Sequence, residues 1–225
     1  MNSAIFDSGP IISLATNNLL WILELMEARF SGKFYITPQV KYELVDKPIE
    51  THRFKFEALQ VNELIAKDVL RIAQSLHIES DGYLLLDLAN HIFKAQGNWI
   101  PVVSLAEMSV VSAGLHLNTS AIFVDEMTTR ALIEDIYSLR ERMESKMHMP
   151  IELHTANAEL FRQRTDGMIV LRSSELATLA YEKGLLERYK NGYSGKDVLD
   201  SVLWGLKING CAIAMEEIED ILKMH

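Results

Sequence analysis

In the first fifth of the chain, short apolar runs alternate with longer stretches whose apolar residues have helical spacing. Residues 4–6 and 34–36 are apolar runs of the kind that form buried strands. The largely apolar stretch 11–30 between them predicts a single helix. Thr37, followed by proline, predicts the start of a second helix. This strand–helix–strand–helix order is typical of a parallel sheet with right-handed crossovers.

The middle of the chain has a more helical pattern. Residues 48–97 are expected to be mainly helical, with Ser80 capping one helix and a short strand at 69–72. A helix is expected over 104–115, because its first four residues, Ser-Leu-Ala-Glu, have the form of a capping box. The apolar run 121–124 then predicts another buried strand.

The last third predicts further helices around one more strand. One long helix is expected from 132 to 147, because its apolar residues keep helical spacing. The irregular stretch 150–167 has the pattern of a strand pair, and 168–171 that of a buried strand. Ser174 and Ser194 are expected to cap two helices that follow. The whole pattern indicates an α/β protein with a central, mainly parallel sheet.

Composition narrows the class of protein. Of the 225 residues, 48% are hydrophobic and 24% are charged, which argues against disordered and fibrous proteins. One cysteine argues against a disulfide scaffold or a cysteine-based zinc site. No apolar stretch approaches the roughly 18 residues that span a membrane, and no basic signal segment is seen. We therefore expect a cytoplasmic protein that makes no membrane contact.

The net charge bears on possible partners. With 22 Lys and Arg against 31 Asp and Glu, the chain carries −9 at pH 7, which gives no diffuse attraction for nucleic acid. A nuclease remains compatible with this charge if carboxylates gather around a metal ion, because the ion then presents positive charge to phosphates.

Four acidic residues are placed to meet at one edge of the sheet. Asp7 and Asp125 each follow a predicted strand, and the carboxyl ends of parallel strands line the same crevice. Glu43 and Glu107 lie near the starts of helices on that side. Converging carboxylates repel one another unless a cation is bound, and oxygen ligands suit Mg²⁺ or Mn²⁺. Such ions promote attack of water on a phosphodiester.

Each acid also has a purely structural interpretation. Asp7 and Asp125 have the pattern of ordinary turn or cap residues. Glu107 is the reciprocal half of the predicted capping box, and Glu43 fits a solvated helix face. The pattern alone leaves both interpretations open.

Three segments resemble the PIN-domain superfamily of metal-dependent ribonucleases. They are IFDSGPIISLA, YITPQVKYEL and SLAEMSVVSAGLHLNTSAIFVDEMTTRAL, and the C-terminal SSELATLAYEKGLLERY is similar to the tail of one prokaryotic subgroup. The resemblance implies a PIN-like three-layer α/β/α domain formed by residues 1–132 and 168–225. It also implies that residues 133–167 are a largely helical insertion.

The resemblance further implies a role for individual residues. Mg²⁺ or Mn²⁺ would be held by four catalytic acids, Asp7, Glu43, Glu107 and Asp125. Substrate would be bound by Ser8 and Arg130, with Glu126 in a supporting role. The implied activity is that of an endoribonuclease, either the toxin of a toxin–antitoxin pair with an antitoxin protein as partner, or an RNA-processing enzyme.

Two other functions stay open. One is a catalytically silent PIN-like scaffold that binds a protein partner or a second copy of itself. The other is a metal-dependent phosphatase or DNA nuclease that uses the same acidic edge. A homodimer is expected, because the apolar stripe that ends at Met143 and Met147 would need cover if the inserted helix projects from the body.

Overall fold

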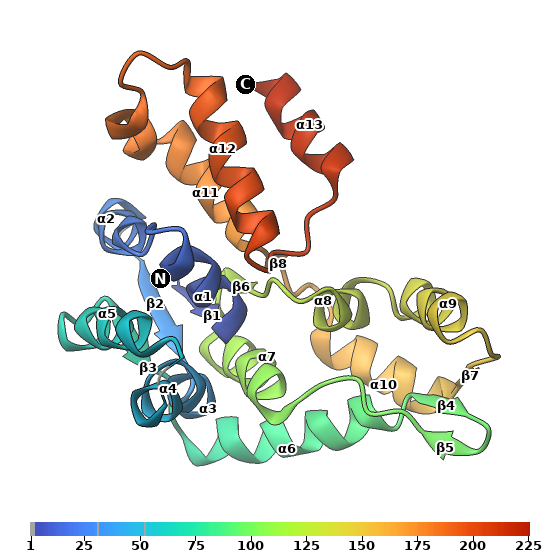
Figure 1. The fold of residues 1–225 in the computed structure, drawn as a ribbon. Coiled ribbons are helices and arrows are strands. Elements are labelled where there is room, and N and C mark those ends of the chain that lie inside the picture. The colour runs from blue at the N-terminus through green and yellow to red at the C-terminus, as the bar shows by residue number, and fades with distance from the viewer. Residues whose placement is uncertain (1–2, 31, 52) are drawn as a thin grey trace.

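The computed structural model describes residues 3–30, 32–51 and 53–225 and has a five-stranded parallel sheet flanked by helices (Figure 1). Its strand order is β3-β2-β1-β6-β8, and each neighbouring pair is parallel. The α/β class and the parallel central sheet expected from the pattern are confirmed. The strands are β1 (Ser3–Phe6), β2 (Lys33–Ile36), β3 (Leu70–Ile72), β6 (Ala121–Phe123) and β8 (Val170–Leu171).

The helices begin and end as follows. The first half of the chain holds α1 (Ser8–Thr16), α2 (Trp21–Phe30), α3 (Pro38–Lys41), α4 (Lys47–Glu50), α5 (Lys55–Ala66), α6 (Leu76–Asn90) and α7 (Leu105–Leu117). The second half holds α8 (Met127–Glu134), α9 (Ile136–Met147), α10 (Thr155–Thr165), α11 (Ser173–Glu182), α12 (Gly195–Ile208) and α13 (Met215–Met224). A π-helical turn, Tyr42–Asp46, joins α3 to α4, and a 3₁₀ turn, Leu185–Tyr189, follows α11.

Helices lie against both faces of the sheet. Phe6 stacks on Phe123 with ring centroids 4.5 Å apart, and α2 and α11 border the same face of the sheet. On the other face α7 lies so close that a Cβ at Gly114 would be 2.8 Å from Cγ2 of Ile122. Only glycine allows this approach, so Gly114 sets how closely α7 packs on β6.

The single helix predicted over 11–30 is wrong, because the chain forms α1 and α2 with a bend of 120° between them. Asn18, in the break, has a φ of 55°, which asparagine tolerates better than most residues. The side-chain amide of Asn17 donates to the carbonyl of Ser13 and so satisfies the end of α1. Among the described residues no single helix is long and apolar enough to cross a membrane, although this bent pair passes by length and composition.

The long helix predicted over 132–147 is also wrong. It is interrupted at Asp135, whose φ of −157° and ψ of 89° are not helical. The Asp135 carboxylate accepts hydrogen bonds from the backbone N–H groups of Tyr137 and Ser138, so it ends α8 and caps α9. The apolar spacing continues through the break, which explains why the pattern did not reveal it.

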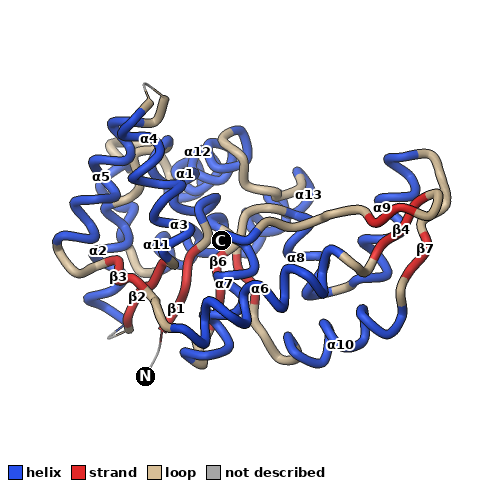
Figure 2. Tube along the Cα trace, turned by 90° about the horizontal axis from the view of Figure 1, so that it is seen from below, coloured by secondary structure: helices blue, strands red, loops and turns tan. Residues whose placement is uncertain are grey.

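A small antiparallel sheet replaces part of the predicted helical region 48–97. The helix there is capped by Ser75 rather than Ser80, and it is followed by β4 (Phe93–Ala95) and β5 (Asn98–Trp99). The strand pair predicted within 150–167 is wrong, because β7 (Glu152–Leu153) pairs with β4 instead. Figure 2 shows β4 and β7 with α9 at one end of the molecule, away from the central sheet.

Helices α11, α12 and α13 pack on one another in order, with α11 next to the sheet (orange and red in Figure 1). Ser194 caps α12 as predicted, through its hydroxyl and the backbone N–H of Asp197. Ser174 does not cap α11, which begins at Ser173 after Arg172. Cys211 is buried beside these helices, and burial raises the pKa of its thiol, as expected for a residue that packs rather than reacts.

Candidate functional site

Asp7 and Asp125 lie together at the carboxyl edge of the central sheet. Asp7 follows β1 directly, and its backbone N–H donates to the carbonyl of Phe123 at 2.9 Å in the neighbouring strand β6. Both acids lie against Gly9, where a Cβ would be 3.3 Å from Cβ of Asp125 and 3.7 Å from Oδ2 of Asp7. The parallel sheet therefore brings together the two acids that end its central strands.

The Asp7 carboxyl is buried and only half satisfied. Its side chain caps α1 through a long 3.5 Å hydrogen bond from the N–H of Gly9 to Oδ2, while Oδ1 has no hydrogen-bond partner. Burial raises the pKa of Asp7 to about 7, against the lowering effect of the nearby backbone N–H groups of Ser8 and Gly9, and the charges of Glu107 and Glu43 raise it further. A buried carboxylate oxygen without a donor, close to two other acids, fits a bound cation.

Glu107 belongs to the capping box predicted at the start of α7. Its Oε2 accepts from the N–H of Ser104 at 2.6 Å, and its own N–H donates to the Ser104 hydroxyl. Its other oxygen, Oε1, accepts a hydrogen bond from the hydroxyl of Thr129 on α8. The capping box is confirmed, and the Thr129 contact fixes the orientation of the Glu107 carboxylate between α7 and α8.

Glu43 reaches the site from the π-helical turn Tyr42–Asp46. Its side chain is exposed, yet its charge contributes to the raised pKa of Asp7. It lines a small pocket with Ile11 and Ile12 of α1. A π-helical turn inside a helical segment is often found at functional sites, because it re-aims one side chain.

Asp125 has a different environment from Asp7. Its Oδ2 accepts from the hydroxyls of Ser13 at 2.6 Å and Ser173 at 2.8 Å, and its Oδ1 accepts from the N–H of Ser173 at 2.7 Å. Its backbone carbonyl also accepts from the N–H of Ala212. Asp125 thus ties α1, α11 and the C-terminal segment to the end of β6, a role that the sequence did not suggest.

The three remaining predicted site residues are spread around these acids. Ser8 is half-buried at the start of α1, next to Asp7. Glu126 is exposed and caps α8 by accepting from the N–H of Thr129 at 2.8 Å. Arg130 lies on the other side of α8, where its guanidinium reaches Glu134 at 3.5 Å and its Nε is buried without a partner.

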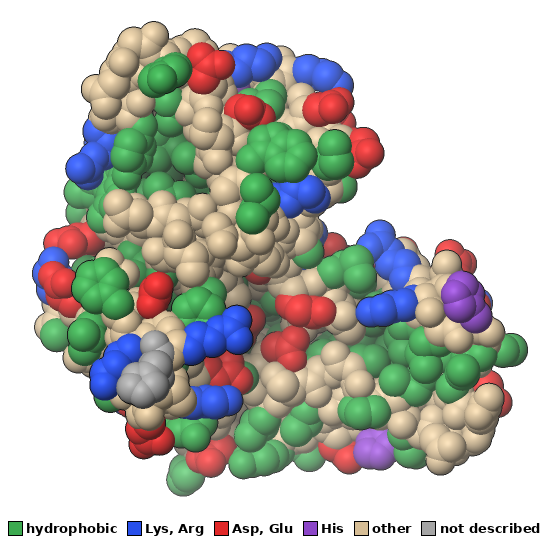
Figure 3. Space-filling model, in the orientation of Figure 1, with side chains coloured by type: hydrophobic (Ala, Val, Ile, Leu, Met, Phe, Trp, Pro, Cys, Tyr) green, Lys and Arg blue, Asp and Glu red, His purple; other side chains and the backbone are tan. Residues whose placement is uncertain are grey.

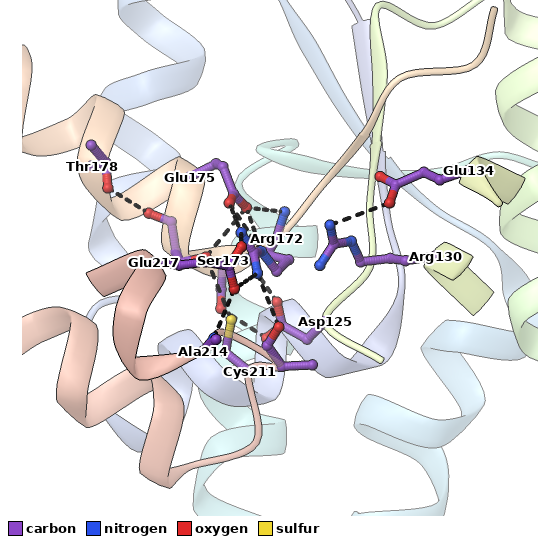
Figure 4. A network of polar contacts seen from close by, with 12 residues as sticks. Asp125, Arg130, Glu134, Arg172, Ser173, Glu175, Thr178, Cys211, Ala214 and Glu217 are labelled. Atoms are coloured by element: carbon purple, nitrogen blue, oxygen red, sulfur yellow. Dashed lines mark hydrogen bonds and ion pairs between the residues drawn. The ribbon is translucent and has the colours of Figure 1, made fainter. Parts of the chain in front are cut away.

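A cluster formed by the buried Arg172 with Glu175 and Glu217, which we call the Arg172 cluster, lies beside Asp125 and was not predicted from the sequence. Arg172 is 6% exposed and donates to Glu175, to Glu217 and to the carbonyl of Ala212 (Figure 4). The hydrogen bonds from Arg172 hold the pKa of Glu217 below its usual range. Since Glu217 lies on α13, the cluster fastens the last helix to the start of α11.

The acids do not form a complete set of metal ligands. Within residues 3–30, 32–51 and 53–225, no three His, Cys, Asp or Glu side chains come together so that they could hold a metal ion as they stand. Asp7 offers a free oxygen, with Glu43 and Glu107 nearby. Both oxygens of Asp125 accept hydrogen bonds from Ser13 and Ser173, and both oxygens of Glu107 accept hydrogen bonds from Ser104 and Thr129. Figure 3 shows acidic side chains in the middle of one face of the molecule, with Lys and Arg side chains to either side.

Comparison of the chain with protein-family models, with curated protein sequences and with solved structures gives no match.

Proposed function

We propose that the protein is a metal-dependent endoribonuclease with a PIN-like three-layer α/β/α fold and its site at the acidic edge around Asp7. The observation that carries this proposal is the unpartnered, buried Oδ1 of Asp7 at the end of the central strand β1. A buried carboxylate normally has its oxygens satisfied, so an orphaned one at a ligand-binding edge of the sheet favours a cation there.

Asp7, Glu43 and Glu107 would hold Mg²⁺ or Mn²⁺ after their side chains turn toward the ion, because among the described residues they do not converge on one point as they stand. When bound, the ion supplies Lewis-acid chemistry that promotes attack of water on a phosphodiester. Asp7 carries a proton part of the time near pH 7 and releases it when a cation takes its place. Glu107 is hydrogen-bonded to Thr129 before it turns, and Ser8 would contact the substrate phosphate beside Asp7. Under this proposal Asp125 supports the site by holding α1 and α11, rather than as a fourth ligand.

Cleavage of labelled single-stranded RNA in the presence of Mn²⁺, Mg²⁺ or EDTA tests the proposal. The wild-type protein should cleave with metal and not with EDTA, and the Asp7→Asn protein should lose the activity. Equal cleavage by both proteins would mean that a contaminant is responsible. No cleavage with either metal would contradict the proposal. Loss of growth on expression would favour a toxin with an antitoxin partner over an RNA-processing enzyme.

A second candidate is a catalytically silent scaffold of the same fold that binds a protein partner or a second copy of itself. It is favoured by the serine hydroxyls that occupy Asp125, and by the lack of three converging metal-binding side chains in the described part of the chain. A scaffold should bind no Mn²⁺ at millimolar concentration. A homodimer detected by light scattering, in a protein without metal affinity, would support the scaffold.

A further inference from the structure

A cavity of about 570 Å³ lies on the far side of α8 from Glu107. Its lining comes from α8, α9, the Arg172 cluster and the segment 212–214. The volume falls within the roughly 300–1,000 Å³ of sites that take small molecules or parts of larger ligands. Figure 4 shows Arg130 pointing from α8 toward the Arg172 cluster.

The cavity shares α8 and the segment 212–214 with the contacts of the acidic edge. Thr129 holds Glu107 by a hydrogen bond, and the next residue, Arg130, lines the cavity. On the opposite wall, the N–H of Ala212 donates to the carbonyl of Asp125. Thr129 and Arg130 of α8 thus link the acidic edge to the cavity.

The acids that line the cavity are already engaged. Asp135 caps α9 with its carboxylate, and Glu217 accepts from Arg172 and from the N–H of Ala214. Glu134 makes one contact with Arg130 at the long distance of 3.5 Å. The carboxylate oxygens of all three acids therefore already accept hydrogen bonds from protein groups.

The arginines keep spare donors. Arg130 has its Nε buried without a partner. Arg142 donates to the thioether sulfur of Met127 and, among the described residues, forms no ion pair with an acid. A thioether is a weak acceptor, so Arg142 can exchange it for an anion. Two guanidinium groups with unused donors at one cavity are suited to a phosphate, which accepts paired N–H bonds.

We propose that this cavity binds a backbone phosphate of the RNA through Arg130 and Arg142. The inference rests on the proposed ribonuclease function and identifies where its substrate is held. The lining carries three arginines, Arg130, Arg142 and Arg172, against three acids, Glu134, Asp135 and Glu217, so the cavity is less acidic than the chain of net charge −9 as a whole.

Binding without cleavage tests the proposal. The affinity of a fluorescein-labelled single-stranded RNA decamer would be measured by anisotropy in EDTA, for wild type, Arg130→Gln and Arg142→Gln. The matched control is Arg162→Gln, which removes the same charge from an exposed arginine paired with Glu159 outside the cavity. Each cavity variant should bind about tenfold more weakly and lower the slope of log affinity against log salt by about one. The control should stay within about twofold of wild type.

The outcomes separate the cavity from the nuclease. Arg142→Gln and Arg162→Gln with equal affinities would overturn the cavity site, even if the protein cleaves RNA. Wild type that binds no decamer would overturn it as well. Weakened binding confined to the cavity variants would support the site, even if no metal gives cleavage. Arg142 is exposed, so its variant carries the test if Arg130→Gln fails to fold.

Discussion

Asp7 and Asp125 follow neighbouring parallel strands and lie against the same glycine, but their carboxylates are in opposite states. Asp7 has one oxygen without any hydrogen-bond partner, while Asp125 accepts three hydrogen bonds from Ser13 and Ser173. The first arrangement is costly unless a cation binds, and the second stabilises the fold. The two residues should therefore respond in opposite ways to replacement.

Replacing Asp7 with asparagine should stabilise the metal-free protein at high pH. The folded-state pKa is about 7, against an ordinary value of 3.8, so the folded protein binds the proton more tightly than the unfolded chain. Stability of wild type therefore falls as pH rises from about 4 to about 7 and stays lower above that. At pH 8 in EDTA, Asp7→Asn should unfold in urea with a free energy about 4 kcal/mol above wild type, at roughly 1.4 kcal/mol for each pKa unit.

The same pair of proteins at pH 4 serves as the control. There Asp7 is protonated in the folded protein, so the free energies of unfolding should converge. A difference of the same size at both pH values would show that the charge of Asp7 is not the cause.

Replacing Asp125 with alanine should destabilise the protein. It leaves the hydroxyls of Ser13 and Ser173 and one N–H without their acceptor, in a buried place. We expect a loss of about 3 kcal/mol in urea unfolding. Ser13→Ala should cost about 1 kcal/mol, because it removes one of the hydrogen bonds. An Asp125→Ala protein as stable as wild type would contradict the structural role given to this residue.

Replacing Arg172 with methionine should loosen α13. The change leaves the partly exposed Glu175 and Glu217 without the buried guanidinium that they contact, and losing hydrogen bonds of this charged kind costs roughly 1.5–3 kcal/mol. Limited proteolysis should then cut near the start of α13, within residues 212–217. Arg162→Met on α10, which breaks only an exposed pair with Glu159, should cost less than about 1 kcal/mol. An equal loss of stability in Arg172→Met and Arg162→Met would contradict the role given to Arg172 in holding α13.

The sequence predicts those parts of the fold whose cause is local. The strands at 4–6, 34–36 and 121–124 were predictable, because each is a short apolar run bounded by turn or cap residues. The capping box of Ser104 and Glu107 was predictable for the same reason. The acids that follow these strands could be placed at one edge, because parallel strands share the direction of their ends.

The rest depends on contacts between distant residues. Ser13 looks like any small residue of an apolar helix, and its partner Asp125 is 112 positions away. Arg172 meets Glu217 45 positions further along the chain. The helix breaks at Asn17–Asn18 and Asp135 were missed because the apolar spacing runs through both, while polar side chains satisfy the broken backbone.

Binding of Mn²⁺ measured by calorimetry tests the central claim most directly, because it needs no substrate. Wild type at pH 8 should give a saturable heat signal. Its apparent affinity should fall as pH is lowered through about 7, because Asp7 must lose its proton to bind the ion. Asp7→Asn should bind at least about tenfold more weakly at pH 8. No heat signal in wild type, or the same affinity in both proteins, would contradict a cation site at Asp7.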